Sequence, residues 1–157
     1  MATEQEKTGN RARMWGLTVA GMTMGIWDMV EESAVSLSPG IGEQILKMAE
    51  KQLGLEIAGE SPRHILIELG RIFVDEYGFC SEALVEGEEP SLKVTLKNAV
   101  GVPEYVGLRA QGLEKPFSHP FYCTGLAALA RLGKRARGNV EMDLASKTAV
   151  ITYDILN

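Results

Sequence analysis

The segment from His119 to Ile155 constrains the fold more than any other, because it joins one helical pattern to two alternating patterns. Pro120 suits the first turn of a helix for which Ser118 is a candidate cap, and apolar or small residues then recur at helical spacing as far as Arg131. Two runs of alternating apolar and polar residues follow, and their apolar rows are Val140, Met142 and Leu144, then Ala149, Ile151, Tyr153 and Ile155. A period of two predicts strands with one buried and one exposed face, which is typical of an antiparallel sheet.

The rest of the chain divides into elements of the same kinds. A second pair of strands is predicted at residues 79–87 and 91–100, where Leu92, Val94 and Leu96 alternate with polar residues. Three helices are predicted before them, at residues 11–34, 38–54 and 61–78. Ser38 and Ser61 are expected to cap the second and third of these helices, because each precedes a proline. The segment 98–120 is rich in glycine and proline and is expected to be irregular, either a lid or binding loop or a mobile connection.

This order of elements predicts the fold class. We expect an α+β fold of the order ααα-ββ-α-ββ, with about four helices packed on one face of a four-stranded antiparallel sheet. A chain of 157 residues fits one domain. We expect residues 1–10 to be a disordered tail and residues 11–157 to form a single ligand-binding-like domain.

The first predicted helix contains an uncharged run from Met14 to Trp27. This run is shorter than the roughly 20 residues that a membrane-spanning helix needs, so no membrane insertion is expected and the protein is predicted to be cytoplasmic. Gly21 and Gly25 lie four residues apart and permit the close approach of another helix. Four of the seven methionines fall in this helix, and they suit either an adaptable apolar pocket, a packed core or a dimer seam.

Charge and cysteine content limit the partners. The net charge is −5, which argues against a nucleic-acid partner. The single basic run, Arg131 to Gly138, suits a solvated helix end. Cys80 and Cys123 are too few for a disulfide framework, and with His64 and His119 they do not show the spacing of a zinc site. No metal and no cofactor are therefore predicted.

Cys123 is the residue for which a chemical role deserves weighing. It lies one turn into the last predicted helix, where the helix dipole would lower the pKa of its thiol, and His119 lies four residues earlier. A cysteine nucleophile needs such a base and a group that orients it, and no Asn or Asp stands nearby in sequence. The alternative is a small apolar residue that packs in the core, since free cysteine is among the most buried residue types. Packing is the favoured interpretation, and catalysis by Cys123 and His119 is a minority hypothesis.

Two stretches resemble a known family. "SHPFYCTGLAALARLGKRARGNVEMDLASKTAVITYDI" and "PRHILIELGRIFVDEYGF" resemble the 4-vinyl-reductase-like, or hydrocarbon-binding, domain common in archaea and bacteria. Tyr122, Cys123 and Gly125 match the aromatic residue, cysteine and glycine that open the last helix of that family. Its wider superfamily includes the TRAPP-type vesicle-tethering subunits. The resemblance implies helices on one side of a sheet, usually in a dimer, with an internal cavity for a lipid or another small apolar ligand.

The chain departs from this pattern in two places. Some members of the family carry further cysteines in the last hairpin, whereas this chain has none after Cys123. The acylated cysteine of some tethering subunits precedes the mid-chain helix, where this chain has "LEIAGES" and no thiol. A covalent fatty-acyl anchor is therefore not expected.

Together, pattern and resemblance predict a non-enzymatic binding module, a homodimeric sensor or carrier of a small hydrophobic ligand. The alternative is a structural or scaffold protein that uses the apolar first helix as a partner interface. The residues expected to bind the ligand are Met24, Trp27, Phe73, Tyr122, Cys123 and Leu126.

Overall fold

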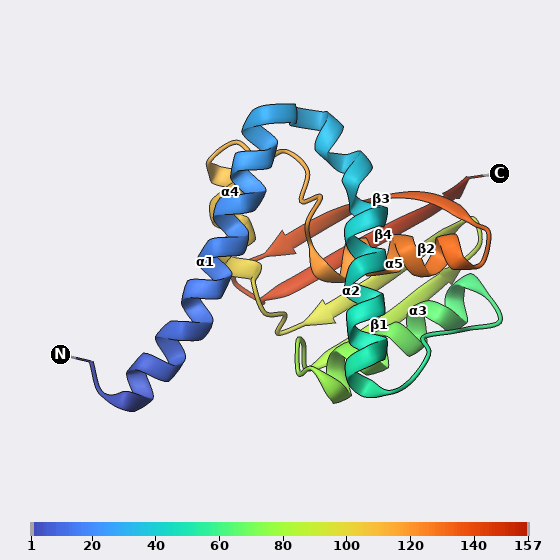
Figure 1. Ribbon diagram of the computed structural model, residues 1–157. Helices are drawn as coiled ribbons and strands as arrows, with labels where there is room; N and C mark the ends of the chain where they lie inside the picture. Colours follow the sequence, from blue (N-terminus) through green and yellow to red (C-terminus); the bar gives the residue numbers. More distant parts are fainter. Residues whose placement is uncertain (1, 157) are drawn as a thin grey trace.

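The computed structural model describes residues 2–156, which form five α-helices, two short helical segments and one sheet. The α-helices are α1 (Glu4–Val30), α2 (Ser38–Leu53), α3 (Pro62–Arg71), α4 (Val102–Ala110) and α5 (Pro120–Arg131), as Figure 1 shows. A 3₁₀ helix, η1 (Glu31–Leu37), follows α1, and a π-helical turn, η2 (Ile72–Glu76), follows α3. The strands are β1 (Glu82–Glu88), β2 (Ser91–Lys97), β3 (Arg135–Asp143) and β4 (Thr148–Leu156).

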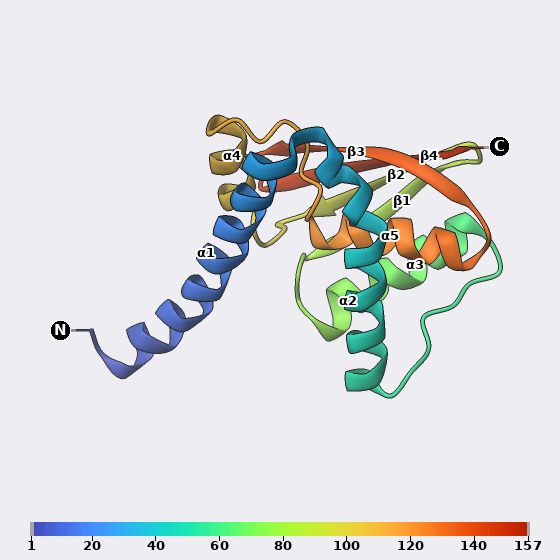
Figure 2. The ribbon, with the colours of Figure 1, turned by 45° about the horizontal axis from the view of Figure 1, so that its top comes forward.

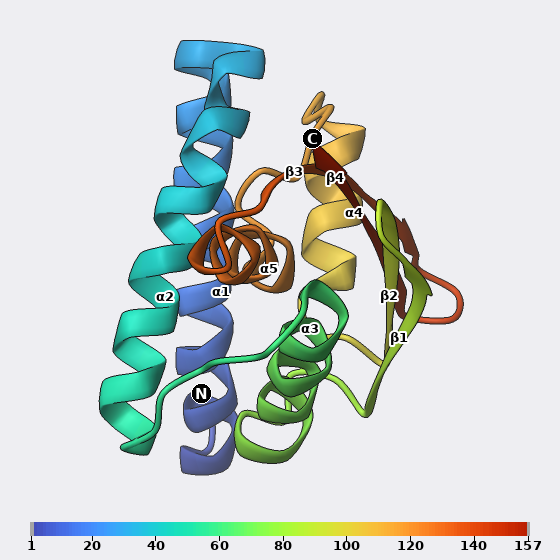
Figure 3. The same cartoon turned by 90° about the vertical axis from the view of Figure 1, so that its right-hand side faces the viewer.

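The four strands form one antiparallel sheet in the order β1-β2-β4-β3. Ile151 of β4 lies opposite Val94 of β2 on one side and Val140 of β3 on the other, so the apolar rows of the two hairpins meet on one face. Helices α3 and α5 cover that face, and α2 lies beyond them (Figures 2 and 3). The other face is polar, as the alternation of residue types predicts. The α+β fold class is therefore confirmed.

One helix is present that the sequence did not predict. Residues 102–110, inside the segment expected to be irregular, form α4. Its glycine and proline stand at the start of the helix, where Gly101 has a left-handed backbone with φ 85° and Pro103 occupies the first turn. Val102, Tyr105 and Leu108 recur every three residues and are buried. The prediction failed because glycine and proline mark helix boundaries as well as loops.

The first helix also starts earlier than predicted. Residues 1–10 were expected to be a disordered tail, yet α1 begins at Glu4 and continues through the expected start at Arg11. A capping box explains the early start, because the Thr3 hydroxyl accepts a hydrogen bond from the Glu6 backbone N–H and the Glu6 carboxylate accepts one from that of Thr3. This first part of α1 projects away from the rest of the molecule (Figures 1 and 2).

Helix caps agree with the sequence in one case and differ in two. Ser61 caps α3 by accepting a hydrogen bond from the His64 backbone N–H at 3.2 Å. Ser38 makes no cap, because its buried hydroxyl instead donates to the carbonyl oxygen of Phe117 at 2.7 Å. His119 rather than Ser118 caps α5, through Nδ1 and the Tyr122 backbone N–H at 3.4 Å. In both exceptions a tertiary contact takes the hydroxyl that a local cap would have used.

Two apolar clusters hold the elements together. The larger lies between the sheet and α2, α3 and α5. The smaller fastens α1 to α4 and to the following segment, and its buried members are Trp27, Ala34, Tyr105, Leu108, Leu113 and Phe117. Beside the smaller cluster, the Ser118 hydroxyl lies 2.7 Å from that of Thr23 and 2.8 Å from that of Tyr105. These contacts anchor the C-terminal half of α1 only, since Thr23 and Trp27 are its two buried residues.

One salt-bridge network reinforces the contact between α2 and α5. The basic run at residues 131–138 was expected to be a solvated helix end, but the Arg131 guanidinium donates to both Glu43 and Glu50 of α2 at 2.6–3.1 Å. These hydrogen bonds hold the pKa of each carboxyl below its usual value. Glu50 also accepts a hydrogen bond from the Ile57 backbone N–H at 2.7 Å, which fixes the α2–α3 connection.

Candidate functional site

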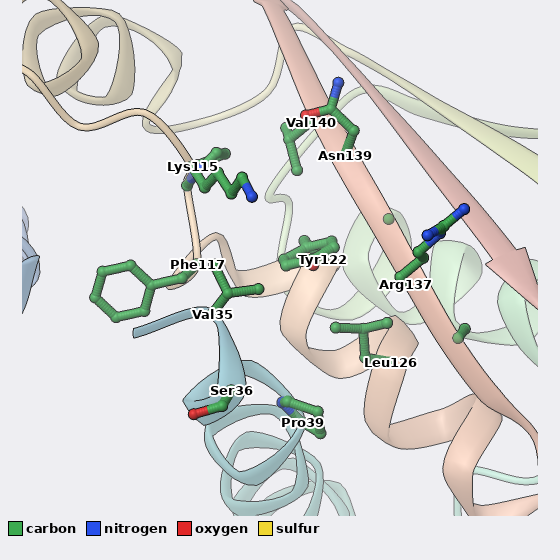
Figure 4. Close-up of a pocket in the computed structure, with 13 residues that line it drawn as sticks. Val35, Ser36, Pro39, Lys115, Phe117, Tyr122, Leu126, Arg137, Asn139 and Val140 are labelled. Atoms are coloured by element: carbon green, nitrogen blue, oxygen red, sulfur yellow. The ribbon is translucent and has the colours of Figure 1, made fainter. Parts of the chain in front are cut away.

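A pocket of about 470 Å³ lies along the open edge of β3 (Figure 4). Strand β3 is the last strand of the sheet, so within residues 2–156 its edge away from β4 has no partner strand. Helix α5 forms the floor, the start of α2 forms one wall, and the segment before α5 forms another. The lining residues are Val35, Ser36, Pro39, Lys115, Pro116, Phe117, Tyr122, Leu126, Ala136, Arg137, Gly138, Asn139 and Val140. Its volume falls within the roughly 300–1,000 Å³ that is usual for small-molecule sites.

Gly138 shapes the floor of this pocket. A side-chain carbon at this position would overlap the carbonyl oxygen of Thr152 and lie 3.1 Å from the Tyr122 ring, so only glycine fits without a shift. The ring of Tyr122 lies parallel to that of Tyr153, with centroids 6.2 Å apart. Tyr153 in turn donates a hydrogen bond from its hydroxyl to the carbonyl oxygen of Phe121 at 2.9 Å. The aromatic floor is therefore held in place by a buried partner from the sheet.

Charge is distributed unevenly around the pocket. Its lining includes the cations Lys115 and Arg137, while none of its lining residues is Asp or Glu. The two cations come from opposite sides of the pocket, above an apolar floor that includes Tyr122 and Leu126 (Figure 4). Lys115 is half-exposed, and Glu32 lies 3.9 Å away from its ammonium group. An apolar floor below a positive rim suits an amphipathic ligand with an anionic end.

The six residues predicted to bind a ligand do not meet in one pocket. Tyr122 and Leu126 line the pocket beside β3. Phe73 lines a different pocket of about 430 Å³ between α2 and α3. Trp27 stacks on Phe117 with ring centroids 6.4 Å apart, and Met24 packs at the edge of the same smaller cluster. Cys123 is enclosed in the larger cluster.

Cys123 has the surroundings of a packed thiol. The side chain is fully buried, and Sγ donates a hydrogen bond to the carbonyl oxygen of Phe117 at 2.9 Å. Burial raises the pKa of the Cys123 thiol to about 12, the reverse of the lowering expected from the helix dipole. Desolvation of a thiolate outweighs the dipole here, because the sulfur lies below α2 rather than at an open helix end. This arrangement keeps the proton on the sulfur.

His119 is buried as well and serves as a helix cap. Burial lowers the pKa of its imidazole to about 4, so the ring is neutral at pH 7. Its Nδ1 accepts the Tyr122 backbone N–H, so that nitrogen is occupied within the helix start. Catalysis by Cys123 and His119 remains a minority prediction, and the geometry offers it no activated thiol.

Two further pockets lie away from β3. One of about 470 Å³ lies between α1 and α4, and the pocket between α2 and α3 adjoins it through Phe79, Val100 and Pro120. Both are lined mainly by apolar residues.

Among the described residues, no group of three His, Cys, Asp or Glu side chains is arranged to hold a metal ion. No helix in the described range has the length and apolar character needed to cross a bilayer.

Several lining residues of the β3 pocket escaped the sequence-based prediction. Lys115, Phe117 and Val35 lie in segments without a regular pattern, so only the folded chain brings them to β3. Gly138 did carry a signal, because a glycine in the middle of a strand often marks the close approach of another group.

Comparison with known proteins supports the fold and leaves the family open. No family model matches the chain, and no curated protein matches it. Among solved structures, the chain is similar to the crystal structure of a trafficking protein particle complex subunit 3 from Naegleria fowleri covalently bound to palmitic acid. The TM-score is 0.54 at 12% identity, over 92% of this chain and 97% of that chain. The predicted 4-vinyl-reductase-like resemblance has no support beyond this fold, and the chain is therefore best described as having a TRAPP-like fold.

Proposed function

We propose that the protein is a non-enzymatic module that binds a small apolar ligand with an anionic end in the pocket beside β3. The observation that carries this proposal is the lining of that pocket, which combines an apolar, aromatic floor with Lys115 and Arg137 and includes no acidic side chain. An alkyl or aromatic body would cover Tyr122 and Leu126, and an acid group would lie near the Lys115 ammonium group.

The fold supports a lipid-like ligand. The similar TRAPP subunit was solved with palmitic acid attached covalently. In this chain the corresponding bond is not proposed, because the Cys123 thiol donates to the Phe117 carbonyl oxygen and Cys80 is buried at the start of the sheet. The ligand is bound without a covalent link, by burial of apolar surface and by charge.

The test is direct binding of a fatty acid to the full chain. The heat of binding is measured by calorimetry while the chain is titrated with palmitate. The same titration is carried out with the matched alcohol, hexadecanol. Ala136→Trp places a large side chain in the pocket beside β3, whereas Met48→Trp places the same side chain in the pocket between α2 and α3. Lys115→Ala removes the ammonium group proposed to contact the acid group of the ligand. Lys47→Ala removes an exposed ammonium group of α2 and is the control.

Saturable binding that Ala136→Trp weakens at least tenfold and Met48→Trp leaves unchanged is the expected result. Lys115→Ala is expected to weaken palmitate binding by roughly three- to tenfold, about 1 kcal/mol, and to leave the alcohol unaffected. If Met48→Trp abolished binding and Ala136→Trp did not, the ligand site would be the pocket between α2 and α3. No saturable binding of either compound would overturn the proposal.

A second candidate is a scaffold protein that uses α1 to bind a partner. The specific observation in its favour is the exposure of large apolar residues on this helix, led by Met29 at 83% and Trp15 at 73% exposed. The homodimer expected from the sequence would use such a surface, and ligand binding and dimer formation are compatible because the β3 pocket does not include α1. The cytoplasmic location stays a prediction.

A further inference from the structure

The outward face of α1 has the features of an unpartnered helix interface. Trp27 and Thr23 face the body of the protein, and the opposite side of the helix carries Met14, Thr18, Gly21, Met22, Gly25 and Met29 at helical spacing. Each of these six residues is exposed, and Met14 and Met22 are both 63% exposed. An apolar face of this extent on a long helix normally packs against another element.

The glycines of this face are not explained within the chain. A side-chain carbon at Gly21 or Gly25 would meet nothing within 4 Å. Each glycine in a helix interior costs roughly 1 kcal/mol relative to alanine. At Gly42, by contrast, a side chain would overlap the backbone of α5, so close helix packing explains the residue. Gly21 and Gly25 would permit the same close approach by a helix from outside the chain.

Charge selects the direction of that outside helix. Immediately before the uncharged run of α1 stand Arg11 and Arg13, and immediately after it stands Asp28, followed by Glu31 and Glu32 in η1. Arg13 lines the pocket between α1 and α4, whereas Arg11 lies on the side of the helix that carries Met14 and Met29. Within the described residues, neither Arg11 nor Asp28 has an ion-pair partner. A second α1 in the antiparallel direction places arginines beside acidic residues, whereas a parallel one places like charges together.

We infer that α1 pairs with α1 of a second copy, antiparallel, around a two-fold axis near Gly21. Gly21 then lies opposite Gly21 of the other copy, and Arg11 comes beside the acidic end of the other α1, which begins at Asp28. The pairing covers Met14, Met22 and Met29. This inference deepens the proposed homodimer and gives its geometry.

A membrane surface fits the same face less well. Helices that lie on membranes carry many Lys and Arg residues along their polar side. Here residues 14–27 are uncharged, and the acidic end at Asp28, Glu31 and Glu32 would be repelled by anionic lipids. The second copy is therefore the better occupant.

Variants with one added cysteine test the axis directly. With the axis near Gly21, Gly21→Cys brings two thiols together and is expected to form a covalent dimer on mild oxidation. Met14→Cys is expected to stay uncrosslinked, because a helix rise of 1.5 Å per residue separates the two positions by about 21 Å, beyond disulfide reach. The native Cys80 and Cys123 are both buried and do not interfere. Crosslinking of both variants would indicate parallel pairing and would overturn the inference.

Analytical sedimentation of the full chain measures the dimer dissociation constant and tests the contributions of the glycine face and of the charged residues of α1. Gly21→Leu is expected to raise the dimer dissociation constant at least tenfold, since the side chain separates the helices, while Gly9→Leu is the control at an open position outside the contact. Arg11→Glu is expected to raise the constant about tenfold, and adding Asp28→Lys is expected to restore it. A monomeric wild-type chain at micromolar concentration would overturn the inference, as would binding to phosphatidylserine vesicles that Gly21→Leu leaves unchanged.

Failure of this inference and failure of ligand binding are distinguishable. Ala136→Trp is expected to lose palmitate and to sediment as a dimer, whereas Gly21→Leu is expected to bind palmitate as a monomer. A variant that loses both properties would show that the two sites are coupled and would overturn the independent dimer face.

Discussion

Helices α5 and α1 both contain long uncharged stretches, yet that of α5 is buried and that of α1 is largely exposed. In α5, nine consecutive residues from Phe121 to Leu129 are buried, between the sheet on one side and α2 on the other. In α1, two of 27 residues are buried, and three of its four methionines, Met14, Met22 and Met29, face outward. Glycines follow the same division, since Gly42 and Gly125 border crowded contacts at α5 while Gly21 and Gly25 border open space. Apolar composition therefore marks a surface to be covered, but not which molecule covers it.

The sharpest test of this difference is a single added methyl group at the α2–α5 contact. In Gly42→Ala the new carbon would overlap the carbonyl oxygen of Cys123, and a backbone atom cannot move aside cheaply. We expect the free energy of unfolding to fall by about 3 kcal/mol, measured by urea denaturation. The control is Gly40→Ala in the same helix, where nothing lies within 4 Å and no such loss is expected. Equal effects in the two variants would contradict tight packing of α5.

Acid should loosen the start of α5 before it affects α1. Burial lowers the pKa of His119 to about 4 from an ordinary value of 6.5. Between pH 4 and pH 6.5 the His119 side chain is therefore protonated in the unfolded chain and neutral in the folded chain. Stability is therefore fully present above pH 6.5 and falls as the pH drops towards 4, by about 3 kcal/mol in total.

Denaturation at a series of pH values measures this slope. His119→Gln retains an acceptor for the helix cap and should remove most of the slope above pH 4.5. His64→Gln, at an exposed position of α3, should leave it intact. A slope that survives in His119→Gln would assign the proton uptake to another group.

The hydroxyl cluster below α1 should matter less, but its effect should be local. Ser118→Ala removes the hydroxyl shared by Thr23 and Tyr105 and leaves two buried polar groups without that partner. We expect a loss of about 2 kcal/mol and faster amide hydrogen exchange in the C-terminal half of α1, with α5 unchanged. Ser36→Ala is the control, since the Ser36 hydroxyl is exposed and donates within its own turn, to Ser33. Equal acceleration in α1 and α5 would contradict a separate attachment of α1.

The smallest effect is expected at the projecting start of α1. Gly9→Ala meets nothing within 4 Å and should stabilise the helix by less than about 1 kcal/mol through helix propensity alone. Amide exchange at residues 4–13 should slow accordingly. Gly54→Ala is the contrasting variant, because the left-handed φ of 67° at the end of α2 makes alanine unfavourable. No slowing in Gly9→Ala would argue that residues 4–10 behave as the tail first expected from the sequence.

Local patterns predicted most of the fold. The alternation at Leu92, Val94 and Leu96 correctly assigned the buried face of β2, because a strand displays its side chains with a period of two wherever it lies. Ser61 and Gly54 marked helix ends for equally local reasons. Helix α4 was missed because its glycine and proline were interpreted as signs of a loop.

The candidate site was predicted only in part, because it is built from segments far apart in the chain. Tyr122 and Leu126 lie where the pattern of α5 pointed, towards the sheet edge. Lys115 and Val35 join them only through the packing of the irregular segments around β3. Met24, Trp27 and Phe73 lie elsewhere. Their apolar character predicts that they are buried, but it does not determine which neighbouring surface they pack against.

By itself the sequence determined the kinds of elements, their order and the faces they bury, since these follow from backbone geometry and the spacing of apolar residues. The tertiary structure alone decided which hydroxyls act as caps, where the pocket forms and which apolar helix face remains open. Those outcomes depend on contacts between residues about 80 positions apart, such as the Ser38 hydroxyl and the Phe117 carbonyl oxygen, and no local pattern encodes such contacts.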